Sequence, residues 1–254
     1  MTTVWGTTVG VRSGAPSRVE EEDDVLVAGF PAGMFQTNCY LVAPEPGGPC
    51  VVVDPGQDAE EPLRAALAEH KLTPVAVLLT HGHLDHMWSV TPVCDGDDIP
   101  AWIHPDDRFM LADPLAGVGP MGAQVAAMYP GLEFREPRKV EILADGAELE
   151  LAGVRLTVDH TPGHTVGSVT FRSATEEGQG FVLAGDTLFQ GGVGRTDLPG
   201  GSHEQMLASI NDRLLVLDDD TAVLPGHGPA TTVGAERRSN PFLHGLTNAP
   251  GRNL

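Results

Sequence analysis

The segment Thr80-His81-Gly82-His83-Leu84-Asp85-His86 gathers the side chains that are most able to do chemistry. It holds three histidines and one aspartate, all potential metal ligands, within six residues. The segment directly follows Val75–Leu79, an apolar run that predicts a strand buried on both faces. A loop at the carboxyl end of such a strand can direct several side chains toward one point, so we expect a site there.

Three more potential ligands stand at the ends of other predicted strands. They are His164 in Thr161-Pro162-Gly163-His164, Asp186 in Gly185-Asp186-Thr187, and His227 in Pro225-Gly226-His227-Gly228. Glycine and proline fix sharp turns and let backbone approach a site closely. Five histidines and two aspartates together suit a pair of borderline cations such as zinc, iron(II) or manganese. The isolated histidines elsewhere are interpreted as structural or solvated side chains: His70, His104, His203 and His244.

Short strands and a few helices must position these side chains. Strands are predicted over residues 25–30, 38–42, 50–53, 75–79, 101–103, 147–151, 154–159, 169–172, 181–183 and 222–224, the first three in an antiparallel sheet. Helices are predicted over residues 58–71, with Asp58 as the N-cap, and over residues 203–217, and residues 105–111 continue the strand–helix pattern. Residues 112–137 predict a long loop or an insertion of short helices. Strand-rich halves, each followed by helices, predict a layered sandwich with the helices outside.

The charge of the chain excludes several classes of partner. Its 254 residues carry a formal net charge of −20, and its pI is about 4.6. Nucleic-acid binding needs clustered lysine and arginine, so no nucleic-acid partner is expected. An anionic membrane surface is excluded for the same reason. No run approaches the roughly 18–20 apolar residues that a transmembrane helix requires.

Cysteine usage and the N-terminal segment predict location and domain organisation. Cys39, Cys50 and Cys94 form an odd set without a Cys-x-x-Cys pair, which excludes a disulfide framework. Residues 1–24 lack the basic start and apolar core of a secretory signal and end in an acidic run, which predicts a flexible extension. Residues 25–254 are then a single domain, and a cytoplasmic location is expected. The sequence predicts no particular oligomeric state.

The pattern His81-x-His83-x-Asp85-His86, followed by His164, Asp186 and His227, resembles the metallo-β-lactamase superfamily over residues 25–244. The resemblance implies an α/β (α+β) fold, the αββα sandwich, with metals at one edge between the two sheets. It implies two divalent metal ions, one bound by His81, His83 and His164, the other by Asp85, His86 and His227, with Asp186 bridging both. Zinc is the expected metal, and iron and manganese are the alternatives.

Longer segments are similar to glyoxalase II-like hydrolases, which cleave thioesters of the hydroxyacylglutathione type. These segments are residues 35–40, 160–168 and 185–189, while residues 194–201, 225–232 and 236–241 look like the compact bacterial branch. The resemblance implies a thioesterase with a small-molecule acyl-thiol substrate.

A hydroxide shared by the two cations would attack the acyl carbonyl, and Asp85 would orient this hydroxide besides binding metal. Arg195 is a candidate contact to a substrate carboxylate, or a tie to Asp197 within its own loop.

Other functions stay open at this stage. Only residues 228–254 follow His227, so the basic glutathione contacts of longer glyoxalase II enzymes cannot be transferred to this chain. The rival enzymes are an iron-dependent persulfide dioxygenase and a lactonase. A non-enzymatic metal-binding module is the alternative from another class, and it would bind stoichiometric metal without turnover.

Overall fold

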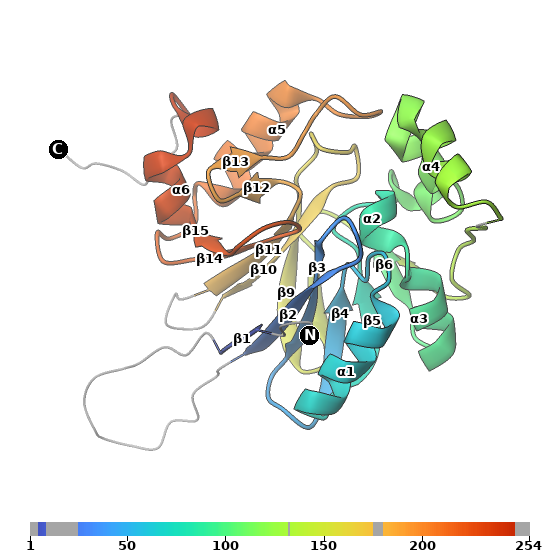
Figure 1. The fold of residues 1–254 in the computed structure, drawn as a ribbon. Coiled ribbons are helices and arrows are strands. Elements are labelled where there is room, and N and C mark those ends of the chain that lie inside the picture. Colours follow the sequence, from blue (N-terminus) through green and yellow to red (C-terminus); the bar gives the residue numbers. More distant parts are fainter. Residues whose placement is uncertain (1–4, 9–24, 132, 175–179, 247–254) are drawn as a thin grey trace, which may run out of the picture.

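The computed structural model describes residues 5–8, 25–131, 133–174 and 180–246. Two β-sheets lie face to face, with α1 and α3 outside the first and α5 and α6 outside the second (Figure 1). The first sheet has seven strands in the order β1-β2-β3-β4-β5-β6-β7, and the second has six in the order β15-β14-β11-β10-β9-β8. This αββα arrangement confirms the predicted sandwich.

The first sheet begins antiparallel and continues parallel. Its strands are β1 (Trp5–Thr8), β2 (Leu26–Ala32), β3 (Thr37–Ala43), β4 (Pro49–Val53), β5 (Thr73–Leu78), β6 (Ala101–Ile103) and β7 (Val140–Ile142). Strands β1 to β4 pair antiparallel, and β4 to β7 pair parallel. The helices of this half are α1 (Glu60–His70), α2 (Leu84–Met87), α3 (Val90–Asp97), the 3-10 helices Arg108–Leu111 and Pro114–Met121, and α4 (Gly122–Met128).

The second sheet contains a parallel pair of strands. Its strands are β8 (Glu148–Leu151), β9 (Val154–His160), β10 (Val169–Ala174), β11 (Gly180–Gly185), β14 (Ala222–Pro225) and β15 (Thr231–Thr232), while β12 (Leu188–Phe189) and β13 (Gly192–Val193) form a separate ribbon. The pair β11 and β14 is parallel, so both strands end at the same edge. The helices are α5 (His203–Ser209), which continues as a π-helix over Ile210–Leu214, α6 (Val233–Ser239) and the 3-10 helix Pro241–Leu243.

Three apolar clusters hold the four layers together. The central cluster packs residues of the first sheet, such as Val51 and Leu78, against residues of the second, such as Leu156 and Phe171. An outer cluster joins the first sheet to α1 and α3, and another joins the second sheet to α5. Removal of apolar surface from water on both faces of each sheet stabilises this arrangement. Strands that are covered on both faces then present only their ends to a site.

Most of the predicted elements are present, but the predicted start of the first helix is wrong. The N-cap position belongs to Ala59, and no side chain caps this helix. Asp58 instead adopts a left-handed backbone conformation with φ 55°. It stands in the turn in which the Ala59 amide donates to the Gly56 carbonyl, so it precedes the helix and cannot cap it. Residues 112–137 contain a 3-10 helix and α4, as an insertion of short helices would.

Three further sequence features have counterparts in the structure. Four residues of the predicted N-terminal extension, Trp5–Thr8, form β1 at the edge of the first sheet, and the remainder of residues 1–24 lies outside the described residues. Cys39, Cys50 and Cys94 are buried and free, which agrees with the absence of a disulfide framework. Among the described residues, no helix has the length and apolar character needed to cross a membrane.

Candidate metal centre

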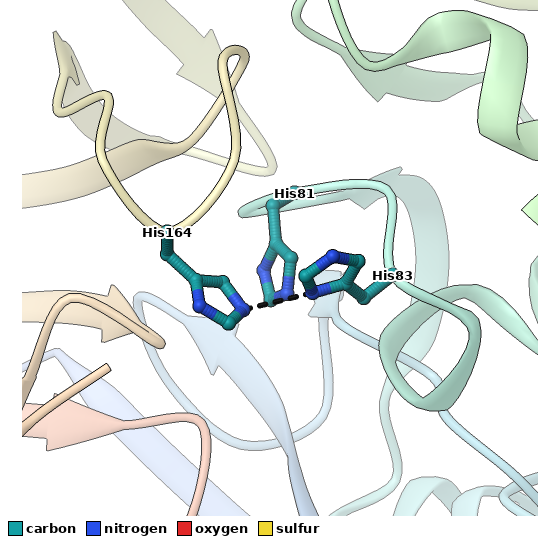
Figure 2. A group of neighbouring side chains, drawn as sticks. All are labelled: His81, His83 and His164. Carbon is teal, nitrogen blue, oxygen red and sulfur yellow. Dashed lines mark hydrogen bonds between the residues drawn. The ribbon is translucent and has the colours of Figure 1, made fainter. Parts of the chain in front are cut away.

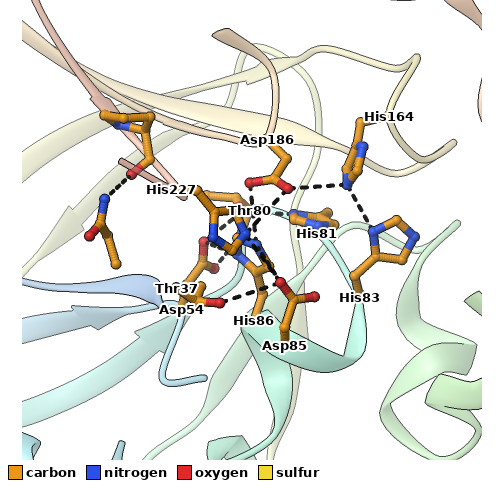
Figure 3. A network of polar contacts seen from close by, with 12 residues as sticks. Thr37, Asp54, Thr80, His81, His83, Asp85, His86, His164, Asp186 and His227 are labelled. Carbon is orange, nitrogen blue, oxygen red and sulfur yellow. Dashed lines mark hydrogen bonds and ion pairs between the residues drawn. The ribbon is translucent and has the colours of Figure 1, made fainter. Parts of the chain in front are cut away.

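All seven predicted ligands converge at one edge of the sandwich, where loops from both sheets meet (Figure 3). The loop after β5 and the helix α2 supply His81, His83, Asp85 and His86 from the first sheet. Three separate loops of the second sheet supply the others: His164 after β9, Asp186 after β11 and His227 after β14. The convergence follows from the topology, because the carboxyl ends of parallel strands lie at the same edge of a sheet.

The histidines His81, His83 and His164 form one group (Figure 2). Their ring centroids lie 4.9 Å apart for His81 and His83, 4.7 Å for His81 and His164, and 4.5 Å for His83 and His164. The Nδ1 atom of His83 is 2.8 Å from Nε2 of His164. Each ring offers one nitrogen within 4.8 Å of the nitrogens of the other two, so a single cation can reach all three.

Asp85, His86 and His227 form a second group. The Asp85 Oδ2 atom lies 3.1 Å from Nε2 of His227 and 3.6 Å from Nε2 of His86. Asp186 stands between the two groups: its Oδ1 is 3.3 Å from His86 Nε2, and its Oδ2 is 3.5 Å from His164 Nε2 and 3.6 Å from His227 Nε2. A carboxylate in this position can contact cations in both groups.

Neighbouring groups fix how three of the rings are turned. The His81 Nδ1 atom contacts Thr80 Oγ1 at 3.1 Å, and the His86 Nδ1 atom contacts Asp54 Oδ2 at 2.9 Å. The His164 Nδ1 atom contacts the Arg195 carbonyl oxygen at 2.8 Å. A hydrogen-bond partner on one ring nitrogen orients the ring and leaves the other nitrogen for a metal. The Nε2 atoms of the three rings therefore point toward the centre.

Several atoms at the centre lack any hydrogen-bond partner. They are Nε2 of His81, Nε2 of His86 and Oδ1 of Asp186, all fully buried. Leaving a buried polar atom unpaired costs about 1–3 kcal/mol, so such a concentration requires an explanation. Divalent cations bound by these nitrogen and carboxylate ligands would satisfy all three atoms. The donor set therefore fits metal ions, by its chemistry and by its unpaired atoms.

Burial and charge set the protonation of the centre. Burial, with the neighbouring histidines, lowers the pKa of His81 well below its usual range and that of His83 to about 3. Burial would also lower the pKa of His86, but Asp186 and Asp85 outweigh it and raise the value well above normal. His81 and His83 are therefore neutral at pH 7, which is the form that binds cations.

The first sheet holds the His227 turn in place. The side-chain amide of Asn38 on β3 donates to the carbonyl oxygens of Pro225 at 3.0 Å and Gly228 at 2.8 Å. The Tyr40 hydroxyl donates to the same Pro225 carbonyl at 2.8 Å. Both residues belong to segment 35–40, which carried the glyoxalase II resemblance. Their role is therefore to bind the two sheets together beside the centre.

Glycine is required at the close approach before His227. A Cβ atom on Gly226 would lie 2.4 Å from Asp186 Oδ1 and 2.6 Å from His86 Cε1. No side chain could shift these two groups without disturbing the centre. Gly226 thus leaves room for Asp186 and His86.

Three polar residues at the centre were missed by the sequence reading. Asp54, at the end of β4, contacts His86 and Thr80, and Thr37 donates to Asp85 Oδ2 at 3.3 Å. Asp107 connects the two loops that carry His81, His83 and His164. The sequence could have indicated Asp54, because this residue follows a predicted strand that could be paired with the strand before His81. No sequence pattern distinguishes Asp107, since it is one of two consecutive aspartates in a polar segment.

Arg195 lies beside the centre, but its guanidinium is paired. Its Nε and Nη2 atoms donate to the two carboxylate oxygens of Asp197 at 2.7 and 2.8 Å. Its carbonyl oxygen contacts His164, as described above. The structure thus shows the tie within the loop that was one of two expectations for this residue.

Comparison with known proteins places these features in a family. A family model described as the metallo-beta-lactamase superfamily matches residues 32–227. An uncharacterized protein of Mycobacterium tuberculosis is 55% identical over 226 residues, covering 88% of this chain and 100% of that protein. The probable metallo-hydrolase YqgX of Bacillus subtilis is 38% identical, covering 86% and 97%. The hydroxyacylglutathione hydrolase GloC of Haemophilus influenzae is 35% identical, covering 85% and 96%.

Solved structures share the fold. The B3 metallo-beta-lactamase BLEG-1 matches with a TM-score of 0.74 and 37% identity, covering 86% of this chain and 100% of that one. TTHA1623, solved in a di-iron-bound form, matches with a TM-score of 0.66 and 42% identity, covering 84% and 98%. ETHE1 from Myxococcus xanthus matches with a TM-score of 0.62 and 25% identity, covering 81% and 78%.

Proposed function

The chain belongs to the metallo-beta-lactamase superfamily, and from that premise we propose that it is a two-metal hydrolase of acyl thioesters. The observation that carries the proposal is the presence of two separate ligand groups with one carboxylate between them. A single-metal enzyme would need only one group. The proposal assigns the first cation to His81, His83 and His164, the second to Asp85, His86 and His227, and the bridge to Asp186.

Two divalent cations held at these residues would supply a hydroxide nucleophile near neutral pH and a positive charge for the developing oxyanion. Asp85 keeps one carboxylate oxygen against His227 and Thr37, so the carboxylate is held in place to orient an attacking water. The two aspartates offset only part of the charge of two cations, and the histidines add none when neutral. The excess positive charge is then available to the substrate carbonyl.

The thioester part of the proposal depends on the resemblance to glyoxalase II-like hydrolases and on one relative. That relative, the hydroxyacylglutathione hydrolase of Haemophilus influenzae, aligns with almost its whole length. The native metal stays open, because zinc was expected from the ligand types and TTHA1623 was solved with two irons. Acyl-thiol hydrolysis tolerates either metal in this scheme, since both cations act as Lewis acids.

The proposal is tested by assaying a panel of acyl thioesters while metals are quantified on the same sample. We expect thioester hydrolysis and two equivalents of metal in the wild-type protein. Asp186→Ala should lose double metal loading and should lower turnover by more than about 100-fold, beyond the effect of losing an outer hydrogen-bond partner of a ligand. Glu150→Ala is the control, since Glu150 is an exposed side chain on β8.

Three results would contradict the proposal. An Asp186→Ala variant with full activity and two metal equivalents would overturn the ligand assignment. Persulfide consumption with oxygen uptake, one iron per chain and no thioester hydrolysis would favour the dioxygenase instead. Metal binding without turnover of any thioester or lactone would indicate a binding module.

A further inference from the structure

Asp107 is a buried carboxylate that connects loops from opposite sheets. Its side chain lies in the segment after β6 and is almost fully buried. Its Oδ2 accepts the Gly82 amide at 3.0 Å and the Thr165 hydroxyl at 2.6 Å, and its Oδ1 accepts the Gly167 amide at 2.8 Å. We propose that Asp107 is a positioning residue that sets the geometry of the His81, His83 and His164 group.

Two of the three donors that reach Asp107 are next to proposed ligands in sequence. Gly82 lies between His81 and His83 in the loop of the first sheet, and Thr165 follows His164 in the loop of the second. One carboxylate therefore holds the first loop by the Gly82 amide and the second by the Thr165 hydroxyl, each on a residue adjacent to a proposed ligand. The Thr165 hydroxyl also lies 2.7 Å from the Ser168 hydroxyl, which extends the contact within the second loop.

The packing around Asp107 leaves no space for larger residues. A Cβ atom on Gly82 would lie 2.8 Å from the Asp107 carbonyl oxygen, and one on Gly167 would lie 2.7 Å from the Asp107 carboxylate. Both glycines thus allow the two loops to approach this residue. The Asp107 amide donates to the His104 carbonyl at 3.1 Å, which fixes the segment itself to the end of β6.

The groups around Asp107 indicate that its carboxylate positions the two loops and does not form an ion pair. Among the described residues, all of its side-chain donors are neutral: two backbone amides and one hydroxyl. A buried carboxylate is costly unless hydrogen bonds satisfy it, and three short charge-assisted bonds do so here. The same bonds are lost if the two loops move apart. The hydrogen bonds that stabilise the buried carboxylate therefore also hold the two loops at a fixed distance from each other.

This link should act on one cation more than on the other. His81, His83 and His164 come from two sheets, and a metal site requires its ligands to be placed within about 0.5 Å. The second group relies on other supports, namely Asp54 for His86, and Asn38 and Tyr40 for the His227 turn. Loss of Asp107 should weaken the first group selectively.

The test compares Asp107→Asn with Glu236→Gln. The asparagine side chain has the same shape, but its NH2 group would face the Gly167 amide or the Gly82 and Thr165 donors, so one loop contact is lost. Glu236 is a matched control, because it is a buried carboxylate that accepts from the Gly191 amide, the Thr231 hydroxyl and the Asn240 amide. Its donors do not adjoin any proposed ligand in sequence.

We expect Asp107→Asn to lower the affinity of one metal equivalent by about 10- to 100-fold, as loss of an outer hydrogen-bond partner of a ligand does. After dialysis against a chelator it should retain one equivalent where the wild-type protein and Glu236→Gln retain two. Cobalt(II) titration followed by visible absorption resolves the two equivalents. The melting temperature of each metal-free variant measures any general loss of stability.

The inference rests on the proposed function, and the outcomes separate the two. If the wild-type protein holds two equivalents and Asp107→Asn holds both with unchanged affinity, the inference is overturned and the proposed function stands. Equal weakening of both equivalents, in Glu236→Gln as well as in Asp107→Asn, would show a merely structural role and would overturn it too. A wild-type protein that binds no metal would overturn the metal centre itself.

Discussion

Asp54 uses both oxygens of its carboxylate where β4 ends beside β5. Its Oδ1 accepts the Thr80 amide at 2.9 Å, and its Oδ2 accepts the Thr80 hydroxyl at 2.6 Å and contacts His86 Nδ1 at 2.9 Å. The backbone at Asp54 has φ 50°, a conformation that aspartate and asparagine tolerate better than most residues. The contact with Nδ1 turns Nε2 of His86 toward Asp186.

Replacing Asp54 with asparagine should therefore impair the second metal group without straining the backbone. An amide NH2 facing His86 Nδ1 would make this nitrogen an acceptor, and the ring proton would move to Nε2, where it blocks metal binding. We expect Asp54→Asn to lower the affinity of one metal equivalent by about 10- to 100-fold. Metal content after dialysis against a chelator measures the effect. Two equivalents held as tightly as in the wild-type protein would show that the contact does not orient the ring.

The types and spacing of residues predicted which side chains would meet, but not what would hold them. The four ligands between His81 and His86 form a local pattern, so they could be found without a fold. Asp54 and Asp107 act through contacts with residues that are distant in sequence. The role of Asp54 follows from strand pairing and that of Asp107 from loop packing, and the spacing of the ligands alone indicates neither role.

At the scale of elements, strands with an apolar run were predictable, and very short strands without such a run were not. The predicted 101–103 strand coincides with β6, and β9 and β14 differ from their predictions by one residue at an end. The two-residue strands β12, β13 and β15 were missed, because they exist only through pairing with a neighbour. The strand β7 was also missed, because it is a three-residue edge strand in which two of the three side chains are exposed.

The ends of β6 and β9 meet through two histidines that the proposed mechanism does not use. The rings of His104 and His160 stack with centroids 4.3 Å apart and an angle of 6° between their planes. Asp106, Asp107 and Asp145 are the acidic groups around His104. Burial, followed by the nearby His160, lowers the pKa of His104 despite these carboxylates. His104 is therefore harder to protonate in the native state than in the unfolded chain.

This shift predicts how stability depends on pH. Because the folded pKa lies below the unfolded value of about 6.5, the unfolded chain binds more protons as the pH falls through that value, and stability is lost. His104→Phe keeps an aromatic ring for the stack but removes this titration. We expect its free energy of unfolding to fall less than that of the wild-type protein between about pH 7.5 and 5.5. Urea unfolding of the metal-free proteins measures this, and parallel pH profiles would contradict it.

At the scale of the whole molecule, acidic groups outnumber and neutralise the basic ones. The net charge is −20, and every arginine that the structure describes lies within salt-bridge distance of a carboxylate. Lys139 is paired with Asp98, and Lys71 lies before β5, at the opposite end of that strand from the ligand loop. Arg195 is the arginine whose backbone contacts a proposed ligand, and Asp197 neutralises it. Within the described residues, an anionic substrate would thus meet no unpaired arginine at the centre.

This distribution of charge predicts a preference among thioesters under the proposed function. S-Lactoylglutathione carries a net negative charge in its thiol portion, whereas S-lactoyl-N-acetylcysteamine is neutral. Asp197→Asn releases Arg195 from its bidentate partner, so it should raise kcat/KM for the glutathione thioester and leave the neutral one unchanged. An exposed ion pair contributes little, so the expected increase in kcat/KM is about one and a half- to fivefold.

The salt dependence separates this effect from a change in loop shape. Added salt screens exposed charges, so the gain of Asp197→Asn on the glutathione thioester should shrink as ionic strength rises. A change in loop shape would alter both substrates and would persist at high salt. Equal changes for the two thioesters would therefore show that Asp197 acts on the shape of the site. A selective, salt-sensitive gain would show that the acidic surface of the molecule extends to the edge of its metal centre and discriminates among substrates there.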